Sequence, residues 1–152
     1  MKMAHYTKQE RAMILTMRIL MIAFFTTAIL FALLPNYTLN YISDIGRVMF
    51  SWYSPNVHTG QVHFWLIPTV SFLLALSYLC AVVQKDPAQH IEYVRLILIT
   101  TFASAVGFAV YLFSVSWQFF YLVGAITNAL IFIITVALYS SATRSRNRWT
   151  TA

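Results

Sequence analysis

Charged residues are scarce in this chain. Only 9% of its 152 residues are charged, while 60% are hydrophobic. An ordinary soluble domain carries about 25% charged residues. A soluble fold of this composition would have too little polar surface to cover its apolar side chains, whereas a bilayer accepts them. The composition therefore excludes an ordinary soluble domain and indicates a membrane protein.

Cysteine and acidic residues are also rare. Cys80 is the only cysteine, so the chain alone can form neither an internal disulfide nor a cysteine-rich metal or iron–sulfur site. Four acidic residues face ten basic ones, which gives a net charge of +6. The basic residues flank apolar runs and do not line a polar face with interleaved aromatics, so no nucleic-acid partner is expected. Anionic lipid headgroups are the expected partners.

Four apolar runs are long enough to cross a bilayer, which takes about 20 mainly apolar residues. They predict spans at about 13–34, 64–83, 94–115 and 119–139, followed by a basic tail at 140–152. The first run has the basic flank of a signal peptide but is too long for one, so we interpret it as a retained span. The short connection before the last run forces an antiparallel hairpin. The predicted fold is a single all-α integral membrane domain, residues 1–152, with four transmembrane helices in an antiparallel bundle.

The basic residues also predict an orientation, because lysine and arginine flanks are retained on the cytoplasmic side. Nine of the ten lie on the side of the two termini, and only Arg47 lies on the other. Both termini are therefore expected on the cytoplasmic side of a bacterial inner membrane, or on the matrix side of a mitochondrial one. Arg18 lies about one turn inside the first span, where it can snorkel to headgroups or pair with Asp86 or Glu92.

The outer segment, residues 36–65, is the only long stretch that cannot be read as a span. Asn40, Asp44, Arg47 and Ser51 recur in it at spacings of four, three and four, which is one helical face. Apolar and aromatic residues fill the other face. This pattern predicts an amphipathic helix at about 40–53 lying in the outer interface. The expected interface residues are Ile42, Ile45, Met49, Trp52, Tyr53 and Trp65.

Ionisable residues are missing from the middle of every predicted span. This argues against a proton or sodium pathway and against an intramembrane bis-histidine haem. No nucleophile is paired with a base, so no catalytic residue is assigned, and a non-enzymatic role is favoured while an enzymatic one stays open. His58 and His63, with Asp44, offer an alternative outer metal site, but their spacing matches no usual ligand pattern. They are better interpreted as interfacial polar residues, and no metal is assigned.

Small polar side chains are expected to form one layer in the outer half of the bundle. Counting 1.5 Å per residue along antiparallel spans places them at similar depths. The members of this polar layer are Asn128, Ser104, Ser71, Thr26 and Thr27. Interhelical hydrogen bonding is the favoured interpretation, with a ligand-contacting pocket as the alternative. No cofactor is predicted, although a bound lipid or quinone is compatible with the sequence.

Two further patterns are interpreted as packing. Met13, Met17 and Met21 recur every fourth residue along one face of the first span. Thioethers suit Cu(I), but the stripe has no companion elsewhere, so adaptable packing is favoured. Small residues four apart, Ala103 with Gly107 and Ala125 with Ala129, predict close helix contacts within the bundle or with a neighbour.

The stretch from His63 onward, HFWLIPTVSFLLALSYLCAVVQKDPAQHIEYVRLILITTFASAVGF, carries a set of features in a recognisable order. These are Phe64-Trp65 opening the second span, Tyr78 near its end, Asp86-Pro87 in the loop and Arg95 entering the third span. About the last two-thirds of the chain thereby resembles DoxX-like and related small four-span bacterial membrane proteins. The resemblance implies a four-helix membrane bundle and, for some members, quinone-linked or thiol redox partners. The resemblance assigns no catalytic residue to this chain, and the long outer segment does not fit the pattern of these proteins.

The leading functional hypothesis is a small non-catalytic integral membrane subunit. It would pack with and stabilise a larger membrane complex, such as a redox or energy-converting one. The alternative is a quinone- or thiol-linked redox helper or small-molecule binder in the DoxX-like manner. A small transporter or channel is the third hypothesis, because the spans offer only hydroxyl and amide groups to line a path.

Overall fold

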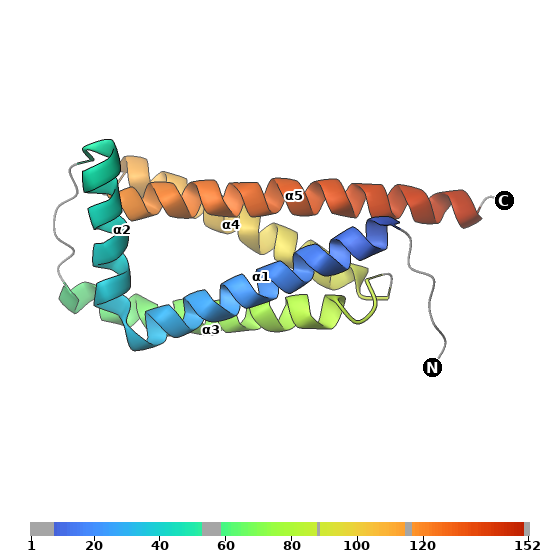
Figure 1. Ribbon diagram of the computed structural model, residues 1–152, viewed down its shortest axis with the longest axis horizontal. Helices are drawn as coiled ribbons and strands as arrows, with labels where there is room; N and C mark the ends of the chain where they lie inside the picture. Colours follow the sequence, from blue (N-terminus) through green and yellow to red (C-terminus); the bar gives the residue numbers. More distant parts are fainter. Residues whose placement is uncertain (1–7, 53–58, 88, 115–116, 151–152) are drawn as a thin grey trace.

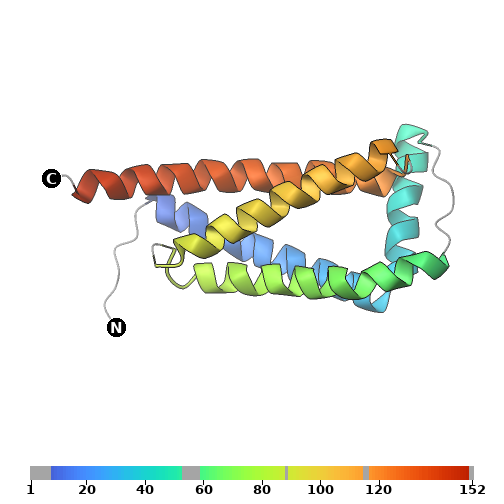
Figure 2. The same cartoon turned by 180° about the vertical axis from the view of Figure 1, so that it is seen from behind.

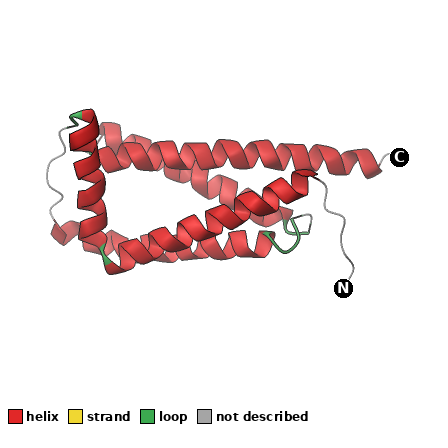
Figure 3. Cartoon of the chain, viewed as in Figure 1, coloured by secondary structure: helices red, strands yellow, loops and turns green. Residues whose placement is uncertain are grey.

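The computed structural model describes residues 8–52, 59–87, 89–114 and 117–150, and within these the side chains of all but 59–65 and 142–150. The described residues are helical apart from short connections, and they contain no strand (Figure 3). This confirms the predicted all-α class.

The described part of the chain forms five helices. They are α1 (Lys8–Leu33), α2 (Pro35–Phe50), α3 (Thr59–Val83), α4 (Ile91–Ser114) and α5 (Phe119–Thr150). By length and composition, α1, α3 from Leu66, α4, and α5 as far as Ser141 are long and apolar enough to cross a membrane. The expectation of four such helices is confirmed.

All four long helices extend beyond the apolar runs that predicted them, and α4 does so by beginning at Ile91. α1 begins at Lys8, α3 begins at Thr59, and α5 continues through the basic tail to Thr150. Once a helix has been nucleated, adding a residue needs only a backbone hydrogen bond, and lysine, glutamine, glutamate and arginine are good helix formers. Helix ends therefore do not coincide with the ends of the apolar runs.

The predicted bounds of the helix in the outer segment, 40–53, were wrong at both ends. α2 begins at Pro35 because proline fits the first helical turn, where its missing N–H has no partner to lose. Leu34, with φ −134° and ψ 52°, separates it from α1. Ser51 adopts a left-handed conformation with φ 50°, and the N–H of Trp52 donates to the carbonyl of Gly46 at 3.1 Å. This C-terminal cap ends α2 at Phe50.

The four long helices run along the long axis of the molecule, successive ones in opposite directions, and α2 lies across one end (Figure 1). α1 lies beside α3, and α4 lies beside α5. The two pairs diverge toward α2 and approach each other at the opposite end, as the view from behind also shows (Figure 2). We call these the α2 end and the converging end.

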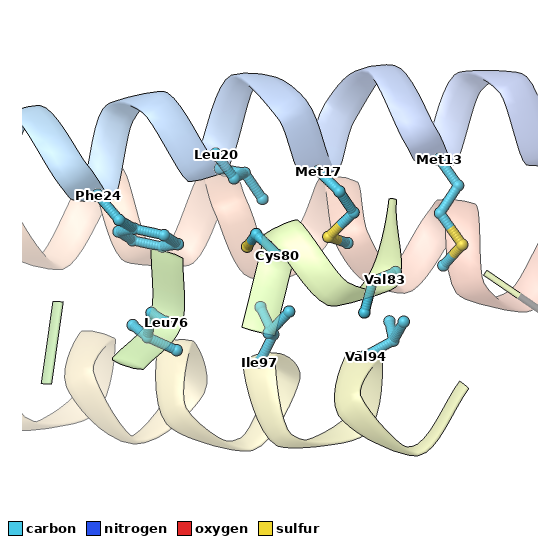
Figure 4. Close-up of a cluster of buried hydrophobic side chains, with 9 residues drawn as sticks. All are labelled: Met13, Met17, Leu20, Phe24, Leu76, Cys80, Val83, Val94 and Ile97. Atoms are coloured by element: carbon cyan, nitrogen blue, oxygen red, sulfur yellow. The ribbon is translucent and has the colours of Figure 1, made fainter. Parts of the chain in front are cut away.

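The buried core lies at the converging end. The side chains of α1 point toward those of α3 and α4 (Figure 4). The cluster consists of Met13, Met17, Leu20, Phe24, Leu76, Cys80, Val83, Val94 and Ile97. Ile131 and Tyr139 of α5 pack against it, so all four long helices contribute. The two buried methionines serve as packing residues, in agreement with their interpretation from the sequence.

Polar side chains join the helices around this core. Ser77 Oγ of α3 donates to the carbonyl of Met21 in α1 at 3.0 Å, and Gln84 Nε2 donates to the carbonyl of Cys80 at 3.2 Å and lies 3.4 Å from that of Met17. Between α4 and α5, Arg95 Nε donates to the Tyr139 hydroxyl at 2.8 Å. Such interhelical bonds are worth about 0.6 kcal/mol each in a bilayer.

Arg18 does not form the ion pair that was one of its two expected roles. Its side chain is exposed, and among the described residues it pairs with neither Asp86 nor Glu92. Glu92 instead binds Arg95 Nη1 through both carboxylate oxygens, at 2.9 and 3.0 Å. Glu92 and Arg95 are three residues apart on one helix, a spacing at which side chains are neighbours.

Candidate functional site

The polar layer is not joined by hydrogen bonds in the described structure. Asn128 is half-buried, and its Nδ2 donates to the carbonyl of Gly124 in its own helix at 2.8 Å. Thr27 and Ser104 are half-buried, whereas Thr26 and Ser71 are exposed. Depth counting places residues at one height but does not determine which way they face around each helix axis. A ligand-contacting role for this layer stays a prediction.

The alternative metal site falls largely outside what the structure describes. His58 lies outside the described residues, and His63 belongs to α3 but its side chain is not described. Asp44 is engaged on α2, where its Oδ1 accepts from Arg47 Nη2 at 2.8 Å. Within the described ranges, no three histidine, cysteine, aspartate or glutamate side chains gather in a way that would hold a metal.

The predicted interface residues of the outer segment divide into two groups. Ile42, Ile45 and Trp52 are half-buried, whereas Met49 is exposed. Tyr53 and the side chain of Trp65 lie outside the description. The polar residues Asn40, Asp44 and Arg47 are all exposed, and an amphipathic helix in the interface stays a prediction.

The C-terminal half of α2 is anchored on the start of α5. The rings of Phe50 and Phe119 stack with centroids 5.5 Å apart, and those of Trp52 and Trp117 stack at 5.3 Å. Trp52 Nε1 also donates to the carbonyl of Trp117 at 2.8 Å. Gly46 permits this approach, because a Cβ at that position would overlap the side chain of Phe119. These contacts fix α2 across the ends of the long helices.

Sequence reasoning did not find Gly46 as a contact residue. A glycine within an otherwise helical pattern is itself a signal of close backbone approach. Its partner Phe119 was assigned only as the first residue of a span. The glycine signal does not name a partner, because Gly46 and Phe119 are far apart in the sequence and only the fold brings them together.

The opposite face of α2 is largely exposed. Leu39 and Gly46 are buried and lie seven residues apart, so they mark the side that faces the bundle. Tyr37, Tyr41 and Val48 lie on the opposite side at about 100° per residue, and their exposed fractions are 68%, 58% and 79%. The rings of the two tyrosines stack with centroids 6.2 Å apart. We call these three residues the outer aromatic face.

A shallow groove between α4 and α5 is a second apolar surface. It is open and is lined only by apolar residues: Ala105, Val106, Ala109, Ala125, Ile126 and Ala129. The expected small pair Ala125 and Ala129 is therefore at a surface between helices. Gly107 of the other pair faces open space, since a Cβ added there would meet no atom within 4 Å. The groove offers no group that would orient or activate a substrate.

The described residues thus present two apolar surfaces, the outer aromatic face and the groove. The outer aromatic face combines exposed rings with a neighbouring polar strip, and the groove suits an acyl chain or another helix. Comparisons of the chain with protein-family models, with curated proteins and with solved structures yielded no match.

Proposed function

We propose that this protein is a small non-catalytic integral membrane subunit that packs with and stabilises a larger membrane complex. In this proposal α1, α3, α4 and α5 cross the membrane as an antiparallel bundle, and α2 lies amphipathically in the outer interface. The observation that carries the proposal is the outer aromatic face, which the rest of the described chain leaves uncovered.

The chemistry of the outer aromatic face suits a protein partner. Exposed apolar surface costs about 25 cal/mol per Å² in water, so a contiguous patch of it marks an interaction site. Tyrosine is enriched at protein interfaces because its ring buries well and its hydroxyl still finds a partner. Asn40 and Asp44, on the adjacent side of α2, are exposed and supply the polar rim of such an interface.

The distribution of basic residues supports the proposed orientation. Lys8, Arg11 and Lys85 are exposed at the converging end, where α1 begins and α5 ends. Arg47 is the basic residue at the α2 end. Because lysine and arginine are retained on the cytoplasmic side, we propose that both termini lie on the cytoplasmic side of a bacterial inner membrane, or on the matrix side in mitochondria, with α2 on the opposite side.

Site-specific photocrosslinking in native membranes tests the proposal. A photoreactive amino acid at Val48, on the outer aromatic face, is expected to form one discrete crosslink to a second protein. The same group at Asn40, on the polar face, is the matched control and is expected to give a weaker crosslink or none. Crosslinks to lipid alone at Val48, with the protein isolated as a lone monomer in mild detergent, would contradict the subunit proposal.

A small-molecule or redox-helper function in the DoxX-like manner is the second candidate. It is favoured by three half-buried polar side chains on different helices: Thr27 of α1, Ser104 of α4 and Asn128 of α5. Hydroxyl and amide groups of this kind can hydrogen-bond the carbonyl of a quinone. Quinone extracted from the purified protein would support this function, and an unchanged quinone content in Asn128→Leu would remove Asn128 from the site.

A further inference from the structure

We propose that α1 carries a binding site for one anionic phospholipid on its side turned away from the core. Arg11 and Arg18 hold the phosphate, and an acyl chain lies along Leu15, Ile22 and Ile29. The site rests on the membrane insertion proposed above, but it needs no partner protein.

The buried residues of α1 determine which side is free. They are Met13, Met17, Leu20, Phe24 and Ala28, which recur at spacings of three and four and face the other helices. Arg11 and Arg18 are seven residues apart, so they share a different side, and both are exposed. Leu15 lies between them on that side with 58% of its surface exposed. The two guanidinium groups therefore project where no described helix packs.

These two arginines differ from the others whose side chains are described. Arg47 is paired with Asp44, and Arg95 is paired with Glu92. Neither Arg11 nor Arg18 has an ion pair or a hydrogen bond with another described residue. Their charge is therefore balanced from outside the described part of the chain.

The depth of Arg18 makes an anion the natural counter-ion. Seven residues of helix place it about 10.5 Å further along the axis than Arg11, toward the apolar part of the span. An arginine at the centre of a bilayer costs about 2.5–3.5 kcal/mol, and a headgroup drawn toward it reduces that cost. A guanidinium donates two parallel hydrogen bonds to phosphate oxygens, so a phosphate between the two arginines is held by directed bonds as well as by charge.

The rest of the same side points to a whole lipid in preference to a free phosphate. Beyond Arg18 the side is apolar and exposed: Ile22 and Ile29 follow Leu15 at seven-residue intervals and are 56% and 40% exposed. A cationic patch followed by an apolar row matches a headgroup followed by an acyl chain. Because no acidic side chain of the described residues pairs with the two arginines, a headgroup with net negative charge fits better than a zwitterionic one.

Native mass spectrometry of the full chain in mild detergent tests the site. The probes are phosphatidylglycerol, phosphatidylcholine and inorganic phosphate. We expect one phosphatidylglycerol to be retained with clear preference over phosphatidylcholine, and we expect Arg18→Gln to weaken it about fivefold, since one basic residue is worth about 1 kcal/mol near an anionic surface. Arg18→Lys keeps the charge and should retain part of the affinity. Arg47→Gln, at the α2 end, is the matched control and should bind as the wild type does.

Three results would overturn the site. They are equal retention of the two lipids, wild-type affinity for phosphatidylglycerol in Arg18→Gln, and displacement of the bound phosphatidylglycerol by inorganic phosphate. The subunit proposal is judged separately. A lone monomer that still selects phosphatidylglycerol refutes the subunit proposal and supports the lipid site. A protein that crosslinks to a partner at Val48 but shows no lipid preference supports the subunit proposal and refutes the lipid site.

Discussion

The converging end and the α2 end both contain large apolar side chains but use them differently. At the converging end, Met17, Cys80 and Ile97 from three helices are completely buried together. At the α2 end, a few aromatic contacts around Gly46 and Trp52 hold one crossing helix in place. Large apolar side chains on the far side of that helix stay exposed. Apolar residues at one end make the core, and at the other they make a surface.

This difference separates stability from interaction. Substitutions at the converging end should lower the free energy of unfolding of the whole chain, because they act where four helices meet. Substitutions at the α2 end should release one helix and alter what it presents, because few of its residues take part in the core. The four predictions below test this division in order of decreasing effect.

Ile97→Ala should have the largest effect. Ile97 is fully buried in the core, and removing its side chain leaves a cavity that costs about 2 to 3 kcal/mol, toward the low end of core truncations because lipid tails are as apolar as the core. Ile99→Ala on the same helix is the control, since 65% of Ile99 is exposed. Thermal unfolding in mild detergent measures both, and an equal loss in the two variants would contradict a core at this end.

Gly46→Ala should displace α2. The added methyl group overlaps the side chain of Phe119, which costs about 1 to 2 kcal/mol after the gain in helix propensity of about 1 kcal/mol is subtracted. Gly107→Ala is the matched control, because its Cβ meets open space and the change should be neutral or stabilising. Hydrogen exchange of α2 amides measures the effect. Unchanged protection in Gly46→Ala would show that α2 does not pack there.

Trp52→Phe should loosen the end of α2 by about 1 kcal/mol. It removes the hydrogen bond from Nε1 to the carbonyl of Trp117 but keeps an aromatic ring for stacking. Trp52→Ala removes both interactions and should loosen the helix further. Protease sensitivity near residue 52 compares the variants, and identical cleavage rates for Phe and Ala would argue against a contribution from stacking.

Ser77→Ala should have the smallest effect, about 0.6 kcal/mol. It removes the bond from Ser77 to the carbonyl of Met21, which joins α3 to α1. Ser140→Ala is the control, because the bond that Ser140 makes within the described ranges is to the carbonyl of Ala137 in its own helix. Denaturant titration in bicelles can resolve the difference. A larger loss from Ser140→Ala would exclude Ser77 as a tie between the two helices.

Individual residues show how far the candidate sites were predictable. The polar face of α2 follows from the spacing of Asn40, Asp44 and Arg47, because helical periodicity is local. The outer aromatic face was not predicted: Tyr41 and Val48 lie within the predicted helix but were not among the expected interface residues, and Tyr37 lies before the predicted start. Pro35 directly follows the predicted end of the first span at 34, but it also begins α2, where its missing N–H leaves no hydrogen bond unmade.

By itself, the sequence determined the helical class and the four runs long enough to cross a membrane, because hydrophobicity, length and the 3.6-residue period are local properties of the chain. Only the tertiary structure decided which apolar residues are buried. Ile97 and Ile99 are alike in the sequence, as are Gly46 and Gly107, yet one member of each pair is packed and the other is open. Burial depends on how each helix is rotated about its axis and on which helix lies beside it, and those follow from contacts between residues far apart in the chain.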